Sequence, residues 1–389
     1  MICATPRTVS GVKSSPAARA AARVGRACAR AESADDLLRL AGAAIRQAVP
    51  YDAALWFGVD PATLLVTAPS RAEGHLDHGY CAPFWHSEFH DHDAAQFRDL
   101  ARDPVPAATL RGATGGHPAR SRRYREWLVP QGLDDELRAV FRSSGNTWGM
   151  VGFYRERGQA PFTPDDVAVL SAVSGTLGTA LRVRAATGST AWPAAANAPG
   201  LLFFDAEDVL VSANAEAAEW LATAYGPGRD WVGVFADPDH TDILLPMPTF
   251  PLLVRARAVA AGHERGPARL RLRDRNGRWL VLHASCMPGT PAGDGAVVVV
   301  VEPAKSAEIA PIVIEAYGLT AREREVVRAT AQGLSAPEAA AQLHLSPHTV
   351  RDYLKSVFEK VGVSSRGELV AKLFAEHYAD PMHAAMVYD

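Results

Sequence analysis

Cysteine is scarce in this sequence and widely spaced. The 389 residues include four cysteines, none of them in a C-x-x-C pair: Cys3, Cys28, Cys81 and Cys286. Disulfide frameworks and structural zinc sites need closely spaced cysteines, so we interpret these four as ordinary thiols in a reducing compartment.

Long apolar runs are also missing. We find no stretch that approaches the roughly 20 apolar residues a membrane-spanning helix needs. Arginines interrupt the N-terminal region where the apolar part of a signal peptide would lie: Arg19, Arg23, Arg26 and Arg30. We therefore expect no signal peptide, no membrane contact and a cytoplasmic location.

A charge excess and catalytic motifs are absent as well. The net charge is −3 at pH 7, so no overall basicity points to nucleic acid. We find no G-x-S-x-G, P-loop or H-E-x-x-H motif and no paired-carboxylate motif, patterns that place catalytic groups in defined geometry. Nothing resembles a phospho-acceptor receiver domain. We therefore expect neither an enzyme nor a bound cofactor.

The sequence does contain a series of helix starts between Leu319 and Phe374. Three of them are capping boxes, in which a hydroxyl and a glutamate three residues later satisfy free N–H groups of the first turn. These pairs are Thr320 with Glu323, Ser335 with Glu338, and Ser365 with Glu368. The fourth start is Ser346 followed by Pro347, since proline suits the first position of a helix.

The helix that begins at Ser346 is amphipathic. Its apolar stripe is Val350, Leu354, Val357, Phe358 and Val361, and its opposite face carries His348, Arg351, Asp352, Lys355 and Glu359. A helix with such a polar and basic face fits the major groove of B-DNA. The preceding helix, about 336–343, is joined to it by a short turn at 344–345, which predicts a helix-turn-helix.

This segment closely resembles the LuxR/GerE family of bacterial DNA-binding domains. The resemblance rests on Leu319 to Val326, Gly333-Leu334-Ser335, Leu345 to Val350, and Lys360 to Leu369. It implies an all-α, four-helix C-terminal domain, 319–379, whose recognition helix begins at Ser346. It also implies DNA contacts from Ser346, His348, Thr349, Arg351, Asp352, Lys355 and Lys360. Asp352 could accept from cytosine N4, or pair with Arg351 or Lys355 until DNA arrives.

The same segment is nearly neutral. Residues 319–379 contain eight Lys or Arg and seven Asp or Glu. One copy should therefore hold DNA weakly, because non-specific affinity comes from neutralised phosphates. We expect a homodimer that reads an inverted-repeat promoter site in double-stranded DNA. RNA polymerase is a possible further partner.

Residues 32–185 are predicted to form one α+β domain. A helix capped by Ser33, strands at 53–59 and 64–68, a hairpin across 137–155 and a long helix after 163 follow one another. This order, with the helix opening at Thr163-Pro164-Asp165-Asp166, resembles a GAF domain and implies a module that senses a small molecule or a partner. Residues 1–31 hold basic side chains and could form an arm on phosphate; we favour a tail that leads into an Ala-rich helix.

A His-rich, irregular segment lies within this domain, at about 70–132. A concave apolar pocket is the default ligand site, and we place its lining at Tyr80, Phe84, Trp85, Phe89 and Trp148. Histidines could also bind a metal or haem iron, but the one regular pair is His86 and His90, four residues apart. We interpret the segment as a polar, aromatic lid and expect no metal site, with His86 and His90 as the candidates should one exist.

A linker at 186–198, rich in small residues, leads to a second α+β region at 199–303. Strands at 201–205 and 208–211, a helix capped by Asn214, a hairpin turning at Asn276-Gly277 and a last strand at 296–301 are expected. This order resembles a PAS domain, which implies dimerisation or signal relay without a cofactor. In the connector, 304–318, one apolar helical face can form from Ile309, Ile312, Val313 and Tyr317.

Three functions remain open. The first is a transcriptional regulator whose GAF-like and PAS-like domains couple a small-molecule or partner signal to promoter binding. The second is a metal- or haem-dependent sensor or metalloprotein that uses the His-rich segment. The third is a scaffold that acts through protein contacts alone. We favour the first because the C-terminal helical segment carries the most specific motif.

Overall fold

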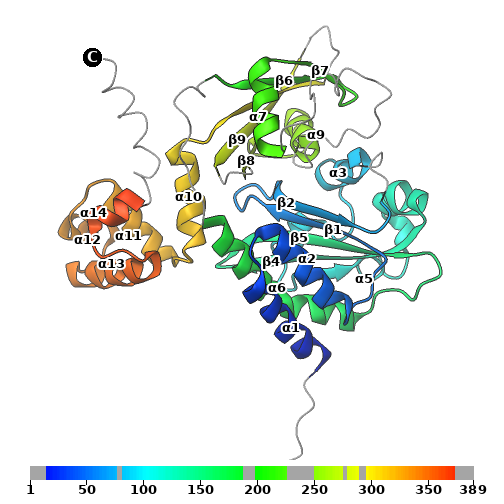
Figure 1. Ribbon diagram of the computed structural model, residues 1–389, viewed down its shortest axis with the longest axis horizontal. Coiled ribbons are helices and arrows are strands. Elements are labelled where there is room, and N and C mark those ends of the chain that lie inside the picture. Colours follow the sequence, from blue (N-terminus) through cyan, green and yellow to red (C-terminus); the bar gives the residue numbers. More distant parts are fainter. Residues whose placement is uncertain are drawn as a thin grey trace, which may run out of the picture.

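In the computed structural model, the chain forms two α+β units and a helical C-terminal module (Figure 1). The structure describes residues 15–76, 81–186, 198–225, 249–274, 278–288 and 295–372. Some sequence predictions lie outside the described residues: the first half of the basic arm, Tyr80, nearly all of the linker, the Asn276-Gly277 turn and residues 373–379.

The first unit contains a five-stranded antiparallel sheet with the order β2-β1-β5-β4-β3. Its strands are β1 (Ala53–Val59), β2 (Val66–Glu73), β3 (Ala107–Thr109), β4 (Leu133–Ser143) and β5 (Asn146–Glu156). The predicted hairpin is the β4–β5 pair. The predicted strand at 64–68 starts too early, because Leu64 has a left-handed turn conformation (φ 60°) and β2 begins after it.

Three helices cover one face of this sheet: α1 (Pro16–Arg30), α2 (Ala34–Arg46) and α6 (Pro164–Ala186). Ser33 caps α2 as predicted, since its Oγ accepts from the Asp36 N–H at 3.0 Å. Residues Ala20 and Val24 of α1 are fully buried in the core that α2 and α6 share. The helix α1 therefore packs as part of the first unit, although the sequence pattern sets 1–31 apart.

Within the described residues, α6 is the one helix long and apolar enough to cross a membrane. This finding corrects the expectation that no apolar run approaches that length. Leu170, Val173 and Leu177 of α6 are nevertheless fully buried in the core of the first unit. The helix therefore has the position of a core helix.

The opposite face of the sheet is covered by short helical segments. They are α3 (Cys81–Phe89), α4 (Phe97–Leu100), α5 (Leu110–Ala113), η2 (Pro118–Arg120), η3 (Tyr124–Leu128) and η4 (Val129–Gln131). They belong to the segment predicted to be an irregular lid. Phe84, Trp85 and Trp127 from these helices pack with Phe57 of β1, so the segment forms a regular layer over the sheet.

The second unit repeats the strand order of the first, as β7-β6-β10-β9-β8. Its strands are β6 (Gly200–Phe204), β7 (Leu210–Ala213), β8 (Ala268–Arg273), β9 (Trp279–Met287) and β10 (Ala296–Pro303). Asn214 caps α7 (Ala215–Tyr225) as predicted, because its Oδ1 accepts from the Ala217 N–H at 3.0 Å. The order of these elements agrees with the predicted α+β region.

A further helix, α9 (Thr249–Ala260), packs on the second sheet and was not predicted. The consecutive residues Leu252, Leu253 and Val254 are all buried, so apolar side chains surround the helix. A stripe at helical spacing is the signal of an amphipathic helix, and α9 lacks one because it is covered on several sides.

The helix α10 (Ser306–Ala316) leads from the second unit to α11 (Ala321–Ala331), α12 (Ala336–Leu343), α13 (Pro347–Val361) and α14 (Arg366–Val370) (Figure 1). Each predicted cap accepts from the first turn of its helix at 3.0 to 3.4 Å: Thr320, Ser335, Ser346 and Ser365. The reciprocal glutamate contact forms at Thr320 and Ser335, but Glu368 accepts from the Ser364 N–H, so the third predicted capping box is incomplete. The predicted apolar face of the connector is buried at Ile309, Ile312 and Val313, and α10 contacts α6.

Candidate functional site

The turn between α12 and α13 sets the position of the predicted recognition helix. His344 takes the left-handed conformation (φ 55°), and the Leu345 N–H donates to the Ala340 carbonyl at 2.9 Å, which ends α12. A small core between the helices consists of Val326, Ala329, Ala339, Ala340 and Val350. The predicted helix-turn-helix is therefore present, and its two helices are packed together.

The outer face of α13 is open to solvent. The side chains of His348 and Asp352 are 83% and 66% exposed, and Nδ1 lies 2.8 Å from Oδ2. Asp352 thus pairs with His348, and with neither Arg351 nor Lys355. These two cations are exposed, and no described carboxylate forms an ion pair with either of them.

Other predicted DNA contacts already have partners within the module. Ser346 Oγ accepts from the Thr349 N–H at 3.0 Å and lies 2.8 Å from Thr349 Oγ1, so both side chains serve the helix start. Lys360 Nζ lies 2.7 Å from each carboxylate oxygen of Glu323. Lys360 therefore joins α13 to α11, and its contact with DNA stays a prediction.

Glu323 is the centre of this joint, with its side chain 4% exposed. Ser356 Oγ donates to it at 2.7 Å, and the Thr320 N–H donates at 2.6 Å. Burial opposes ionisation, but the hydrogen bonds from Lys360, Ser356 and Thr320 outweigh it and lower the pKa of Glu323 to about 2. The capping motif predicts the Thr320 contact alone, because the contacts to α13 depend on tertiary packing.

The connector α10 ties the module to the first unit. Glu315 accepts from Asn146 Nδ2, beside the β4–β5 turn, at 2.6 Å and forms an ion pair with Arg324 of α11. Arg182 of α6 donates to the Ala316 carbonyl. One apolar cluster includes residues of α10, α11 and α13: Ile309, Ile312, Val327, Val357 and Val361. A displacement of α10 would therefore disturb contacts with both the first unit and α13.

The residues predicted to line a ligand pocket do not meet at one place. Phe84 and Trp85 are buried with ring centroids 4.9 Å apart, and Phe89 stacks on Trp85 at 6.3 Å. Trp148 packs instead in the core on the α6 side of the sheet. The register of β4 and β5 shifts between Phe141 and Arg142, opposite Trp148. Such a bulge re-aims a side chain out of the alternation that the sequence pattern assumes.

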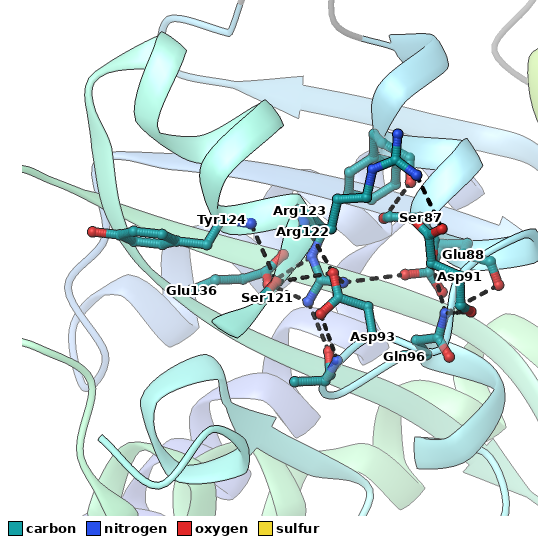
Figure 2. A network of polar contacts seen from close by, with 12 residues as sticks. Ser87, Glu88, Asp91, Asp93, Gln96, Ser121, Arg122, Arg123, Tyr124 and Glu136 are labelled. Atoms are coloured by element: carbon teal, nitrogen blue, oxygen red, sulfur yellow. Dashed lines mark hydrogen bonds and ion pairs between the residues drawn. The ribbon is translucent and has the colours of Figure 1, made fainter. Parts of the chain in front are cut away.

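A buried ionic network lies between this sheet and its layer of short helices (Figure 2). Arg123 and Arg138 are fully buried, and the side chains of Glu88 and Glu136 are at most 4% exposed. Arg123 donates to Glu136 Oε2 from Nε at 3.0 Å and from Nη2 at 2.7 Å. Arg138 donates from Nε to Glu136 Oε1 at 2.7 Å and also pairs with Glu88. None of these four residues was predicted from the sequence to be functional.

The protonation of this network follows from the balance of burial and attraction. Burial disfavours the charge on Glu136, but Arg123 and Arg138 lower its pKa below the ordinary value. Burial, reinforced by Glu136, raises the pKa of Tyr154 on β5. Arg123 Nη1, Arg138 Nη2 and Tyr154 Oη are buried without a hydrogen-bond partner among the described residues. Opposite charges two residues apart in β4, at Glu136 and Arg138, were the available sequence signal.

Histidines gather where α3 meets the second unit. His86 and His90 stack with centroids 4.4 Å apart, and His90 Nδ1 lies 3.3 Å from His263 Nδ1, beyond the end of α9. Burial, with the neighbouring His86 and His263, lowers the pKa of His90. In the part of the chain that the structure describes, no three His, Cys, Asp or Glu side chains are arranged to hold a metal ion.

The comparisons with known proteins concern chiefly the C-terminal module. Residues 318–373 match the family described as bacterial regulatory proteins, luxR family. The chain is 38% identical over 76 residues to the probable transcriptional regulatory protein NarL of Mycobacterium tuberculosis, covering 20% of this chain and 32% of that protein. It is 46% identical over 56 residues to the transcriptional regulatory protein UhpA of Escherichia coli, covering 14% and 29%. The chain thus spans about a third of these relatives.

Solved structures give weaker likenesses. Escherichia coli SdiA is matched over 90% of this chain and 93% of its own, with 11% identity and a TM-score of 0.25. A phage VqmA–DPO complex is matched over 47% of this chain and 83% of its own, with 19% identity and a TM-score of 0.24. Scores this low do not establish a shared fold. The description of the two α+β units therefore depends on their own strand order and packing.

Proposed function

Because residues 318–373 form a LuxR-family helix-turn-helix domain, we propose that the protein is a DNA-binding transcriptional regulator. Its two α+β units are then a GAF-like and a PAS-like sensor that couple a small-molecule or partner signal to promoter binding. The proposal places it in the cytoplasm, with no enzymatic activity and no bound cofactor.

The open face of α13 is the observation that carries this proposal. Arg351 and Lys355 are exposed and without an ion-pair partner among the described residues, on a helix that Glu323 and Lys360 hold to α11. A rigid helix that presents unpaired cations supplies both kinds of contact that DNA recognition needs. Arg351 can read a base edge in the major groove, and Lys355 can neutralise a phosphate.

The near neutrality of the module supports a dimer. With eight basic and seven acidic residues in 319–379, one copy releases few counterions from DNA. Two copies related by a two-fold axis would double the phosphate contacts and read an inverted repeat. The bound dimer could then act on RNA polymerase at the promoter.

The sensor assignment is supported by the shared strand order of the two sheets, each covered by helices. Both units contact α10 or lead into it, and α10 in turn packs on the helical module. A signal can change DNA binding only as far as it favours one arrangement of these contacts over another.

Selection of genomic DNA fragments with the full-length protein tests the proposal. We expect enrichment of an inverted repeat, and we expect Arg351→Ala to weaken binding to it by about 1–3 kcal/mol. Lys355→Ala should weaken binding to all sequences and lower the slope of log K against log salt by about one.

The control is Arg39→Ala, which removes an exposed arginine from α2, far along the chain from the module. It should leave both enrichment and salt slope unchanged. Equal binding by Arg351→Ala, Lys355→Ala and the unaltered protein would contradict the assigned role of α13 and favour a scaffold that acts through protein contacts.

A further inference from the structure

A cleft of about 600 Å³ lies between the two α+β units and does not belong to the DNA interface. The first unit contributes the end of β1, Trp148 and part of α6, and the second contributes β8 and Trp279. Ile312 of α10 completes the lining. β2 and β8, each an edge strand of its sheet, lie next to each other beside α10 (Figure 1). The cleft is thus lined by residues of both α+β units and of α10, the helix that leads to the helical module.

The charged groups of the cleft that are removed from solvent are matched, with one exception. Arg271 at its base is buried and pairs with Asp60 of the first unit, Nη2 to Oδ1 at 2.6 Å. Asp274 pairs with Arg278 at 2.7 Å. Arg184 donates to the carbonyl groups of Cys28 and Ala31. Asp35, at the start of α2, also lines the cleft and is exposed.

The exception is Arg273. Its guanidinium stacks on the Trp279 ring at 4.6 Å, and Nη2 donates to the Ala185 carbonyl at 2.6 Å. Its Nε is buried without a hydrogen-bond partner, and no carboxylate among the described residues pairs with it. Burial lowers the pKa of Arg273 to about 10, so the group still carries its charge at neutral pH. A mostly buried cation without an anion costs folding free energy that a bound anion would recover.

We propose that this cleft binds a small aromatic carboxylate, with its carboxylate on Arg273 and its ring against the indoles of Trp148 and Trp279. Arg is the side chain best suited to a planar carboxylate, because its N–H groups can donate in pairs. Apolar and aromatic walls around a few fixed polar groups are the usual composition of a small-molecule site. This inference rests on the proposed function only where it identifies the ligand as the regulator's signal.

The position of Ile312 explains how such a ligand would act. Ile312 shares its apolar cluster with Val327 of α11 and Val357 of α13, and Glu315, one turn further on, pairs with Arg324 of α11. A ligand that contacts Ile312 differently in two arrangements of α10 favours one of them. The helical module would then change its position on the first unit.

Binding to the full-length protein without DNA tests the site itself. The probes are phenylacetate and indole-3-acetate, measured by calorimetry and by the change in tryptophan fluorescence. We expect saturable binding of one molecule per chain and at least about tenfold weaker binding of phenylacetamide and indole-3-acetamide, which lack the charge. Equal binding of acid and amide, or no binding of either acid at millimolar concentration, overturns the proposal without any variant.

The variant Arg273→Met separates binding from folding. It should weaken both acids at least about tenfold, leave the weak amide binding unchanged, and keep or raise the unfolding temperature of the free protein, because it removes an unpaired buried charge. Arg39→Met, at an exposed helix position, should change none of these. Tight acid binding by Arg273→Met would overturn the assignment. Because these measurements omit DNA, failed promoter selection would leave their result intact.

Discussion

The two α+β units arrange their five strands in the same order, β2-β1-β5-β4-β3 and β7-β6-β10-β9-β8, yet their interiors differ. The core of the second unit is a cluster of apolar side chains among β6 to β10, α7 and α9. The corresponding layer of the first unit holds two arginines and two glutamates with almost no exposure. One topology can thus enclose an apolar core alone or an apolar core with a buried ionic network inside it.

The difference identifies what each unit depends on. An apolar core loses stability in proportion to the area and volume removed, so small changes have graded effects. A buried ionic network depends on charge balance, since removing one partner leaves the other as an uncompensated charge in a low-dielectric interior. Arg271 shows that the second unit also buries a charge, but at its junction with the first unit, opposite Asp60.

Removing one charge from the buried network should reduce the stability of the first unit more than any other single change considered. We expect Arg138→Met to destabilise the first unit by about 3–5 kcal/mol, because Glu88 and Glu136 would share one buried counterion, Arg123, in place of two. Hydrogen exchange of the β4 and β5 amides would measure the effect in this unit alone. The matched control, Arg269→Met on β8, removes a partly exposed partner of Glu308 and should cost at most about 1 kcal/mol.

Replacing the network as a whole sharpens the same test. A combined variant with methionine at Arg123 and Arg138 and leucine at Glu88 and Glu136 should recover most of the loss, since it removes two positive and two negative charges together. Asp93 loses Arg123 as its ion-pair partner but keeps the hydrogen bonds from Ser121 Oγ and from the backbone N–H at position 123. If the combined variant is as unstable as Arg138→Met, the packing shape of these side chains matters more than their charge.

The comparison also shows why the sequence predicted some features and missed others. The caps at Thr320, Ser335 and Ser346 depend on neighbours within three residues, so local chemistry is enough to locate the helices of the C-terminal module. The β4–β5 hairpin is likewise indicated by local sequence, because its turn contains Ser144 and Gly145, and both residues have positive φ.

The features that the sequence missed depend on contacts between distant segments. Glu88 and Arg138 are 50 residues apart, and nothing near either residue indicates that its partner is buried with it. Trp148 lies outside the predicted pocket because the register between β4 and β5 shifts beside it, and the sequence of one strand alone does not predict such a shift. The exposed face of α13 was predictable from periodicity, whereas the joint between Lys360 and Glu323 required α13 to be packed on α11.

The helical module provides an intermediate case, with one buried carboxylate in place of a network. We expect Glu323→Gln to destabilise the module by about 2–4 kcal/mol, because Lys360 and Ser356 lose their charged acceptor. Amide exchange in α11 and α13 would report the change. Glu325→Gln, two residues away in an exposed pair with Arg322, should cost less than about 0.5 kcal/mol.

The pH dependence of the module follows from the same carboxylate. The folded-state pKa of Glu323 is about 2, below the ordinary value of 4.5. Its contribution to stability is therefore fully present above about pH 4.5 and is lost as the pH falls toward 2. In Glu323→Gln this part of the acid transition should disappear, and an unchanged acid transition would contradict the assigned pairing with Lys360.

The junction between the two units should show the smallest effect, with the same sign as that of Glu323 but in a higher pH range. His90 of the first unit faces His86, Asp91 and His263, and its pKa is lowered by burial and the two histidines. The folded protein thus binds fewer protons than the unfolded chain just below pH 6.5, so stability at this contact should fall as the pH drops through that range. Faster amide exchange in α3 and α9 at pH 5.5 than at pH 7.5, after correction for the intrinsic exchange rate, would show this loss of stability.

The variant His90→Gln should reduce the difference in exchange between the two pH values, while His348→Gln on the open face of α13 should preserve it. Unchanged pH dependence in His90→Gln would assign the effect to another group and leave the junction between the units insensitive to protonation.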